Sequence, residues 1–337
     1  MGMKKLLIDI YHLPQFNFFK NVILQYEPEE VDIYCVNRGK LLTVMQHELP
    51  GYTITCLGDY KHNKGMISMV FKIILPRTFE LFKRIKKSKH SFIVTAHYQA
   101  NFVARLKGIP NIAFIDDPRR GVFPLLKFSA DEVYLPPFKK KFSGVKTFKA
   151  LKEWSYLSPK YFKPTREVLQ NYGLRPKEYI FIREVSVETS NYLDQDQGVI
   201  LSIAHDFPKE IPVIISLEDK SLSSNYPAHW QILQEPIENF HSLLYYSKLV
   251  ISSGDSMARE GAMLGVDSVY AGIRNMPAND ILIQTKKLSK LNRENIIPFV
   301  THHFFLFQKD EQDAFRKKLF HEWDDVTEMV LKKVGRN

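Results

Sequence analysis

The chain has 337 residues, of which 45% are hydrophobic and 25% are charged, so its composition is that of a globular protein and excludes a disordered one. The formal net charge of +10 indicates an anionic partner. The two cysteines exclude a disulfide framework and a Cys/His zinc site, and no apolar run approaches the ~18 residues of a membrane-spanning helix. With no signal-peptide pattern in Met1–Ile10, we expect a cytoplasmic protein.

The positive charge is unevenly distributed along the chain. Residues 1–150 hold 24 Lys and Arg against 12 Asp and Glu, a net charge of +12. The remaining residues hold 23 basic and 25 acidic side chains, a net charge of −2. The anionic partner is therefore expected to bind the first half.

Strands and helices alternate in the first half of the sequence. The expected strands are Lys4–Ile10, Val31–Val36, Tyr52–Leu57, Phe92–Thr95, Asn111–Ile115 and Glu132–Leu135. The expected helices are Phe18–Gln25, Met66–Lys87 and Ala100–Leu106. This alternation predicts βαβ units and a parallel sheet.

The same alternation restarts after a proline-containing connection at residues 146–177. The expected strands are Tyr179–Arg183, Val213–Leu217, Leu249–Ser252 and Ser268–Tyr270, and the expected helices are Ile237–Tyr246, Ser256–Leu264 and one or two within Glu311–Lys333. The sequence therefore predicts an α/β protein of two Rossmann-like domains, residues 1–148 and 149–337, that face a cleft. Ligands of such sheets bind beyond the carboxyl ends of the strands.

The segment Leu249–Gly265 (LVISSGDSMAREGAMLG) predicts a strand that passes through a tight turn directly into a helix. Gly254 permits the turn, and Asp255 or Ser256 can cap the helix. The free N–H groups and the positive dipole end of such a helix suit a phosphate. Glu260 lies four residues after Ser256 on the same face, at ribose distance from a phosphate held there. The alternative is an ordinary capped helix.

This segment resembles the nucleotide-sugar site of GT-B-type proteins, the group of the cell-wall N-acetylglucosaminyl transferase and the non-hydrolysing UDP-N-acetylglucosamine 2-epimerases. The opening Ile8–Lys20 (IDIYHLPQFNFFK), the segment Leu244–Gly265 and the strand of Arg183 are similar to the family called domain of unknown function 354. The resemblance implies that the turn binds the UDP phosphates and that the helix glutamate binds the ribose. The implied nucleotide-sugar-binding residues are Arg183, Ser252, Ser253, Gly254, Asp255, Ser256, Met257 and Glu260. A surface ion pair is the alternative for Arg183.

The loop after the first strand departs from the family pattern, in which several histidines occur. His12 is the imidazole of this loop that can act as a general base. The resemblance supports this role, because a histidine in the corresponding loop of the cell-wall transferase serves near the acceptor. A loop histidine bonded to the backbone is the alternative. Gln15 and Asn17 can hydrogen-bond a sugar but cannot take its proton at neutral pH.

Two further loops complete the predicted acceptor side. The epimerases carry an H-G-D-T motif whose Asp transfers protons, whereas Thr95–Gln99 of this chain contains no acid, which counts against epimerase chemistry. His97 can act in its place, or it is a satisfied structural histidine. Asp116 and Asp117 end a strand and are candidate bases or hydroxyl acceptors, and Arg119 can meet a diphosphate. A capped turn is the alternative for this loop.

Basic and apolar residues are mixed in Phe71–Lys89 and in Phe138–Phe142. Such segments suit an anionic membrane surface or a lipid-diphosphate acceptor. The alternative for the longer segment is an amphipathic helix with a solvated face. Because no nucleic-acid module is recognisable, nucleic acid ranks third.

Together these features predict a metal-independent GT-B-type glycosyltransferase that uses a nucleotide sugar, with UDP favoured, in surface polysaccharide or glycolipid assembly. The first domain would bind a glycan or lipid-linked acceptor, with His12, Asp116 or Asp117 as base, and the second would bind the donor. No cofactor is expected, because the helix dipole and Arg183 can stabilise the leaving diphosphate. The C-terminal helices can return to brace the first domain. The alternatives are a UDP-sugar 2-epimerase-like enzyme and a non-catalytic nucleotide-sugar- or membrane-binding protein.

Overall fold

The structure is a computed structural model that describes residues 4–59, 70–118, 123–186, 198–234, 237, 239–306 and 311–336. The chain divides into two compact units, which we call unit 1 (Met1–Tyr156 with Trp323–Asn337) and unit 2 (Leu157–Glu322). The sequence prediction divides the chain at 148/149 and keeps all later residues in the second domain. In the structure Trp323–Asn337 belong to unit 1, the part of the chain that the C-terminal helices are expected to brace.

Unit 1 contains a parallel sheet of seven strands. They are β1 Lys5–Ile10, β2 Val31–Asn37, β3 Ile54–Asp59, β4 His90–Thr95, β5 Asn111–Phe114, β6 Glu132–Leu135 and β7 Lys146–Thr147. Their order in the sheet is β3-β2-β1-β4-β5-β6-β7. The order reverses between β1 and β4, so the loops after these two strands meet at the point where α/β sheets bind ligands.

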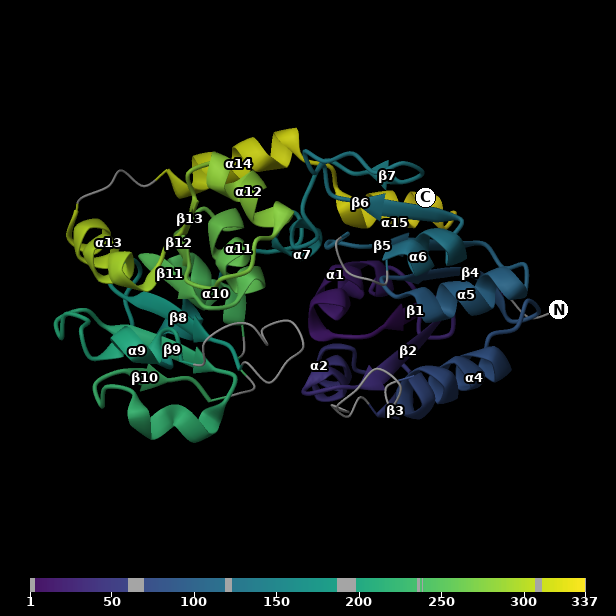
Figure 1. The fold of residues 1–337 in the computed structure, drawn as a ribbon, viewed down its shortest axis with the longest axis horizontal. Helices are drawn as coiled ribbons and strands as arrows, with labels where there is room; N and C mark the ends of the chain where they lie inside the picture. The colour runs from purple at the N-terminus through teal and green to yellow at the C-terminus, as the bar shows by residue number, and fades with distance from the viewer. Residues whose placement is uncertain are drawn as a thin grey trace. The chain divides into compact units, whose positions relative to one another are not determined.

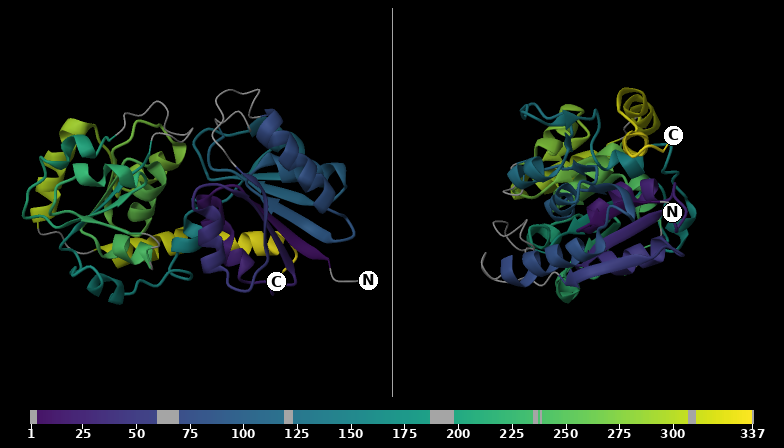
Figure 2. Two further views of the ribbon diagram at one scale, coloured as in Figure 1. Left: turned by 90° about the horizontal axis from the view of Figure 1, so that it is seen from below. Right: turned by 90° about the vertical axis from the view of Figure 1, so that its right-hand side faces the viewer.

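Helices cover both faces of this sheet. They are α1 Leu13–Ile23, α2 Leu41–Glu48, the π-helix η1 Val70–Ile74, α4 Leu75–Arg84, α5 Tyr98–Leu106, α6 Phe123–Ser129 and α15 Val326–Lys333, with α7 Trp154–Leu157 at the division between the units. Figures 1 and 2 show α4, α5 and α6 on one face and α1 with α15 on the other. The inner sides of α4 and α5 join a buried core that includes Leu7, Leu81, Ile85 and Val103.

Unit 2 contains a second parallel sheet, of six strands. They are β8 Ile180–Glu184, β9 Val213–Leu217, β10 Gln231–Ile232, β11 Leu249–Ser252, β12 Asp267–Tyr270 and β13 Leu288–Lys290. The order β10-β9-β8-β11-β12-β13 reverses between β8 and β11. Ligands of open α/β sheets bind beyond the carboxyl ends of the strands at such a reversal, so the ends of β8 and β11 are the candidate site of this unit.

The helices of unit 2 lie on both faces of its sheet. They are α8 Glu167–Gln170, α9 Leu201–Ala204, the 3-10 helix η2 Lys220–Asn225, α10 Phe240–Tyr246, α11 Asp255–Met263, α12 Pro277–Gln284, α13 Arg293–Phe305 and α14 Gln312–Glu322. Successive side chains of β8 point to opposite faces of the sheet. Ile180 and Ile182 enter the core shared with α9 and α13, while Phe181 packs against Phe240 of α10 on the other face.

Several elements differ from their predicted bounds. α1 begins five residues before the predicted Phe18, because Pro14 lies in its first turn, where the missing N–H is no loss. Of the predicted helix Met66–Lys87, residues 70–84 are helical and the part before Val70 lies outside the described residues. None of the helices described is long and apolar enough to cross a membrane.

Candidate functional site

The turn between β11 and α11 is held by two buried serines. The Ser252 hydroxyl donates to the Gly254 carbonyl (2.7 Å) and accepts from the Gly254 amide (3.0 Å). The Ser253 amide donates to the Arg183 carbonyl (3.0 Å), and the Ser253 hydroxyl accepts from the Val185 amide (2.9 Å). The Ser252 hydroxyl therefore closes the turn, and Ser253 joins the turn to the end of β8.

The N-terminus of α11 is not capped by a side chain. Gly254 is the N-cap residue and offers none, and the first amides of a helix have no intrahelical partner. Asp255 is the first helical residue, and the half-buried Ser256 and Met257 follow it. Amides at the positive end of a helix dipole are groups that can bind an anion, so this helix end is a candidate anion site.

Two arginines neutralise the carboxylate in this first turn. Asp255 is buried and pairs with Arg259 (3.0 Å) and with Arg274 (3.4 Å). Arg259 is itself buried and also donates to the Asn279 Oδ1 (2.9 Å) and to the Ser256 hydroxyl (3.3 Å). Two guanidinium groups thus contact one carboxylate, so the negative charge of Asp255 in the first turn is compensated.

Glu260 follows one turn later on the face that Ser256 occupies. Its side chain is 6% exposed, and its carboxylate lies 3.5 Å from the Nε2 of His241 on α10. The histidine thereby restricts the orientation of the glutamate. Ser256 and Glu260 are thus brought together on α11, as the sequence predicts.

Arg183 lies near the carboxyl end of β8, in register with Ser252 of β11. Its guanidinium donates to the Ser216 hydroxyl (2.7 Å) and lies 3.9 Å from the Glu218 carboxylate. The side chain is 18% exposed. Its backbone carbonyl thus contacts Ser253 of the β11–α11 turn, while its guanidinium is held by Ser216 of β9 and by Glu218.

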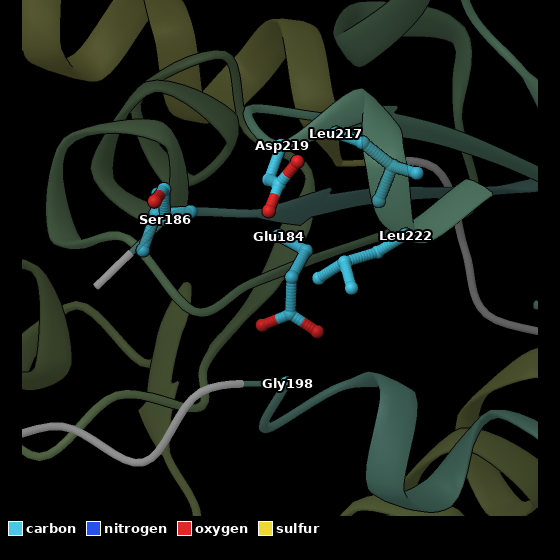
Figure 3. Close-up of a pocket in the computed structure, with 7 residues that line it drawn as sticks. Glu184, Ser186, Gly198, Leu217, Asp219 and Leu222 are labelled. Carbon is cyan, nitrogen blue, oxygen red and sulfur yellow. The ribbon is translucent and has the colours of Figure 1, made fainter. Parts of the chain in front are cut away.

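The opposite face of β8 carries a buried acid at the same edge of the sheet. Glu184 accepts hydrogen bonds from the Ile200 and Leu201 amides (2.8 and 2.9 Å) and from the Tyr226 hydroxyl (3.1 Å). Burial raises the pKa of Glu184 in spite of these donors. Figure 3 shows its carboxylate pointing toward Gly198, in a pocket of about 10 Å³, which is at the lower limit of the space that holds one water molecule. This pocket is too small for a nucleotide.

In unit 1, the loops after β1 and β4 meet in a stack of aromatic and basic groups. The rings of Tyr11 and His97 are parallel, with centroids 4.1 Å apart. The Arg77 guanidinium lies 5.2 Å from the Tyr11 centroid and pairs with Asp9 at 2.5 Å, and both charged side chains are buried. Burial together with Arg77 and His12 holds the pKa of His97 well below its usual range. His97 is therefore neutral at pH 7.

Gln15 joins these two loops. Its Oε1 accepts from the Tyr11 amide (2.7 Å), and its Nε2 donates to the Ala96 carbonyl (3.3 Å). Thr95 donates to the Asp9 carbonyl (2.9 Å) and accepts from the His97 amide (3.0 Å). Gln15 and His97, predicted from separate loops, therefore lie in one hydrogen-bonded unit.

The other predicted residues of unit 1 occupy different positions. His12 is the N-cap residue of α1 and is half-buried, as is Asn17 on the same helix. Asp116 pairs with Lys152 and is half-buried, while Asp117 is buried. Arg119 lies outside the described residues. The described parts of the chain hold no group of three or more His, Cys, Asp or Glu placed to bind a metal ion.

Sequence reasoning missed several polar residues of both sites: Arg259, Arg274 and Asn279 around Asp255, His241 beside Glu260, and Arg77 with Asp9 below Tyr11. Only the pair of Arg259 with Asp255 could have been predicted from the local sequence, because residues four apart on one helix lie on the same face. The others come from elements distant in the sequence.

Residues 4–337 match the model of the family described as protein of unknown function, DUF354. The chain belongs to the DUF354 family. A search of curated proteins gives no match to this DUF354 chain.

Solved structures resemble the DUF354 chain over its full length. UDP-N-acetylglucosamine 2-epimerase from Rickettsia bellii is 12% identical with a TM-score of 0.69, and 99% of this chain and 96% of the epimerase are covered. The epimerase from Neisseria meningitidis bound to UDP-GlcNAc is 15% identical, with a TM-score of 0.61 and coverage of 99% and 100%. MurG from Acinetobacter baumannii is 16% identical, with a TM-score of 0.57 and coverage of 98% and 99%. These matches confirm the predicted GT-B-like fold with two parallel α/β sheets.

Proposed function

We propose that this DUF354 protein is a glycosyltransferase that transfers a sugar from a nucleotide-sugar donor, with UDP as the favoured nucleotide. The observation that carries the proposal is the β11–α11 turn of unit 2. An uncapped helix N-terminus, the two guanidinium groups of Arg259 and Arg274 that compensate Asp255, and Glu260 one turn later occur together at the switch point of the sheet. UDP-GlcNAc bound to the Neisseria meningitidis epimerase, a protein of the same fold, supports the choice of UDP.

In this proposal the amides of Ser256 and Met257 bind the donor diphosphate, and Glu260 accepts hydrogen bonds from the ribose hydroxyls. When the glycosidic bond to the diphosphate breaks, negative charge develops on the leaving phosphate. The helix dipole and the guanidinium groups of Arg274 and Arg183 stabilise that charge, so the reaction needs no metal ion.

Unit 1 would bind the acceptor, a glycan or a lipid-linked sugar. A general base must accept the proton of the attacking hydroxyl. We assign that role to His12, with Asp116 or Asp117, which follow the neighbouring strand β5, as the alternatives. The neutral His97 and the amide groups of Gln15 and Asn17 would bind hydroxyls of the acceptor.

A transferase fits unit 1 better than a 2-epimerase, because no carboxylate occupies Thr95–Gln99 and the nearby Asp9 is buried against Arg77. The assay that separates the two activities uses UDP-GlcNAc with and without a crude lipid-linked or glycan acceptor fraction. A transferase releases UDP only when acceptor is present. Conversion of UDP-GlcNAc without acceptor would establish the epimerase, and UDP binding with neither reaction would favour a binding protein.

The donor site is tested by removing the Glu260 carboxylate. We expect Glu260→Ala to weaken UDP binding by about ten-fold or more, because a hydrogen bond to a charged group contributes roughly 1.5–3 kcal/mol. The same substitution should leave the affinity for 2′,3′-dideoxy-UDP nearly unchanged, since that ligand has no ribose hydroxyl to lose. Isothermal titration calorimetry of the parent protein and of Glu260→Ala with each of the two nucleotides gives four affinities, which form a double-mutant cycle.

Glu311→Ala provides the matched control, because it removes an exposed glutamate from the same unit. Its UDP affinity should equal that of the parent protein. An equal loss of affinity for UDP and for dideoxy-UDP in Glu260→Ala would contradict the assigned ribose contact. No loss for either nucleotide would exclude the proposed donor site.

A further inference from the structure

The outer surface of α4, α5 and α6 in unit 1 carries large apolar side chains that the fold does not use. Their exposed fractions are 60% for Phe79, 46% for Phe82, 61% for Leu106 and 63% for Phe128. The core contacts of α4 and α5 are made by other residues, including Leu81, Ile85 and Val103 on their inner sides. The alternative interpretation, an amphipathic helix packed on the sheet, therefore accounts for the buried residues of α4 and α5. It does not account for the large apolar side chains that are exposed.

Cationic side chains connect these rings into one surface across the three helices. Lys107, at the end of α5, lies 4.1 Å from the Phe82 centroid of α4. Arg105 of α5 lies 5.3 Å from the Phe128 centroid of α6. Within α4, Lys83 lies 4.2 Å from the Phe79 centroid. Figure 1 shows the three helices side by side over the sheet, so we call this outer surface the α4–α6 face.

The charge of the α4–α6 face is strongly positive. Of the seven Lys and Arg in residues 70–89, Arg77 is buried against Asp9 and Lys89 pairs with Asp32. The other five are Lys72, Lys83, Arg84, Lys86 and Lys87, and the one acid of the segment, Glu80, pairs with Lys83 and Arg84. Lys86 and Lys87 follow α4 directly and are exposed. Exposed Phe and Leu beside unneutralised Lys and Arg are complementary to a bilayer with anionic headgroups, because the rings enter the acyl boundary while the cations remain at the phosphates.

We propose that the α4–α6 face docks unit 1 onto an anionic lipid bilayer as a peripheral contact. A protein partner would need acidic groups spaced to match the cations, whereas a bilayer supplies mobile anionic headgroups to every Lys and Arg of the face. No described helix can cross the membrane, so binding is interfacial and salt-sensitive. This proposal goes beyond the donor site in unit 2 and does not depend on it.

Co-sedimentation of the full chain with vesicles tests the proposal. The protein should bind phosphatidylglycerol vesicles at low salt, bind phosphatidylcholine vesicles weakly, and lose most binding at 0.5 M NaCl. Phe79→Ser combined with Phe128→Ser should reduce partitioning by about ten-fold or more, because two buried rings are lost. Lys86→Gln combined with Lys87→Gln should reduce it by about five-fold per lysine on anionic vesicles only.

Unit 2 offers matched controls on α14: Phe320→Ser for the rings and Lys317→Gln with Lys318→Gln for the charges, all at exposed positions. These variants should bind vesicles like the parent protein.

Insertion is measured separately by placing a tryptophan at the face with Phe128→Trp and quenching it with brominated lipids. Unchanged vesicle binding by the Phe79→Ser and Phe128→Ser variant, or no quenching, would overturn the proposal.

The vesicle experiment contains no nucleotide, and the calorimetry of the donor site contains no lipid. A failure of one therefore does not affect the other. If the protein does not bind vesicles and instead self-associates through this face, with the phenylalanine variant becoming monomeric, the face is a protein interface and the membrane assignment is wrong.

Discussion

His97 shows how a single side chain links the fold of unit 1 to pH. Its ring is stacked on Tyr11, near the buried Arg77. Both the loss of hydration and the neighbouring positive charge disfavour the imidazolium, so the pKa of His97 is well below its usual range. In the unfolded chain the same group titrates near ~6.5.

The folding stability should therefore depend on pH through His97. Below about pH 6.5 the unfolded chain binds a proton at this residue that the folded chain does not, so stability falls as the pH falls. The slope from this one group is at most about 1.4 kcal/mol per pH unit, and it vanishes above ~6.5. His97→Gln should have a flatter stability profile between pH 6.5 and 5, as measured by urea unfolding at several pH values.

His302→Gln is the control for that series, because it removes an exposed histidine of α13 in unit 2. It should retain the pH slope of the parent protein. If His97→Gln and the parent protein lose stability in parallel on acidification, the neutral buried state assigned to His97 is wrong.

The limits of sequence-based prediction at this scale follow from where each partner lies in the chain. Ser256 and Glu260 could be placed on one helix face, because their spacing of four is local. Their electrostatic surroundings could not be predicted, since His241 belongs to α10 and Arg274 to the loop after β12. The ion pair of Asp9 could not be predicted either, because its partner Arg77 lies 68 residues later in the chain. From the sequence, Asp9 is only a residue of the first strand.

At the scale of the element, Gly261 sets the distance between α11 and the sheet. A Cβ at this position would lie 2.6 Å from the Ser268 hydroxyl and 2.9 Å from Val250 Cβ. Real Cβ contacts are not that short, so an alanine would push the helix away from β11 and β12. Because the proposed anion site is the N-terminus of this helix, the packing of Gly261 also determines where that site lies.

Gly261→Ala should therefore destabilise the protein by about 1–3 kcal/mol, as overpacked cores do, although alanine favours a helix over glycine by about 1 kcal/mol. The free energy of unfolding in urea measures the effect. Ser268→Ala removes the nearest atom, so the double variant should lose less stability than the sum of the two single variants. Additive losses would show that the helix accommodates the methyl group without steric conflict at Ser268.

Prediction at this scale succeeded where the hydrophobic pattern was continuous. The strands β1, β4, β8, β9 and β11 are buried apolar runs, and each was predicted within two residues of its observed bounds. The short helices α7, α8, α9 and η2 were not predicted, and neither were the longer helices α2, α6, α12 and α13. α13 contains Pro298 in its interior and α12 has a proline in its first turn, and such residues mark turns when only local sequence is considered.

At the scale of the whole molecule, the chain ends in the unit where it begins. Trp323 packs edge-on against Trp154, with ring centroids 5.4 Å apart. Asp324 exchanges two hydrogen bonds with the Lys149 backbone, and Thr327 donates to the Ser155 carbonyl (3.2 Å). The predicted positive charge of the first half thus belongs to a unit that the C-terminal segment completes.

Removal of residues 323–337 should accordingly destabilise unit 1 in particular. α15 packs against α1 and contributes the buried Val326 and Val330, so its loss exposes apolar surface with a cost of about 4 kcal/mol or more. Hydrogen exchange by mass spectrometry should show faster exchange in α1 and β1, with α11 and β11 unchanged.

Two point variants of α15 calibrate this effect. Val330→Ala should reduce the stability of the same unit by a smaller amount, about 2 kcal/mol. Lys332→Ala, at an exposed position of the same helix, should reduce it almost not at all. Equal loss of protection in α11 would contradict the division at Tyr156 and Leu157, because a self-contained unit 2 does not depend on α15.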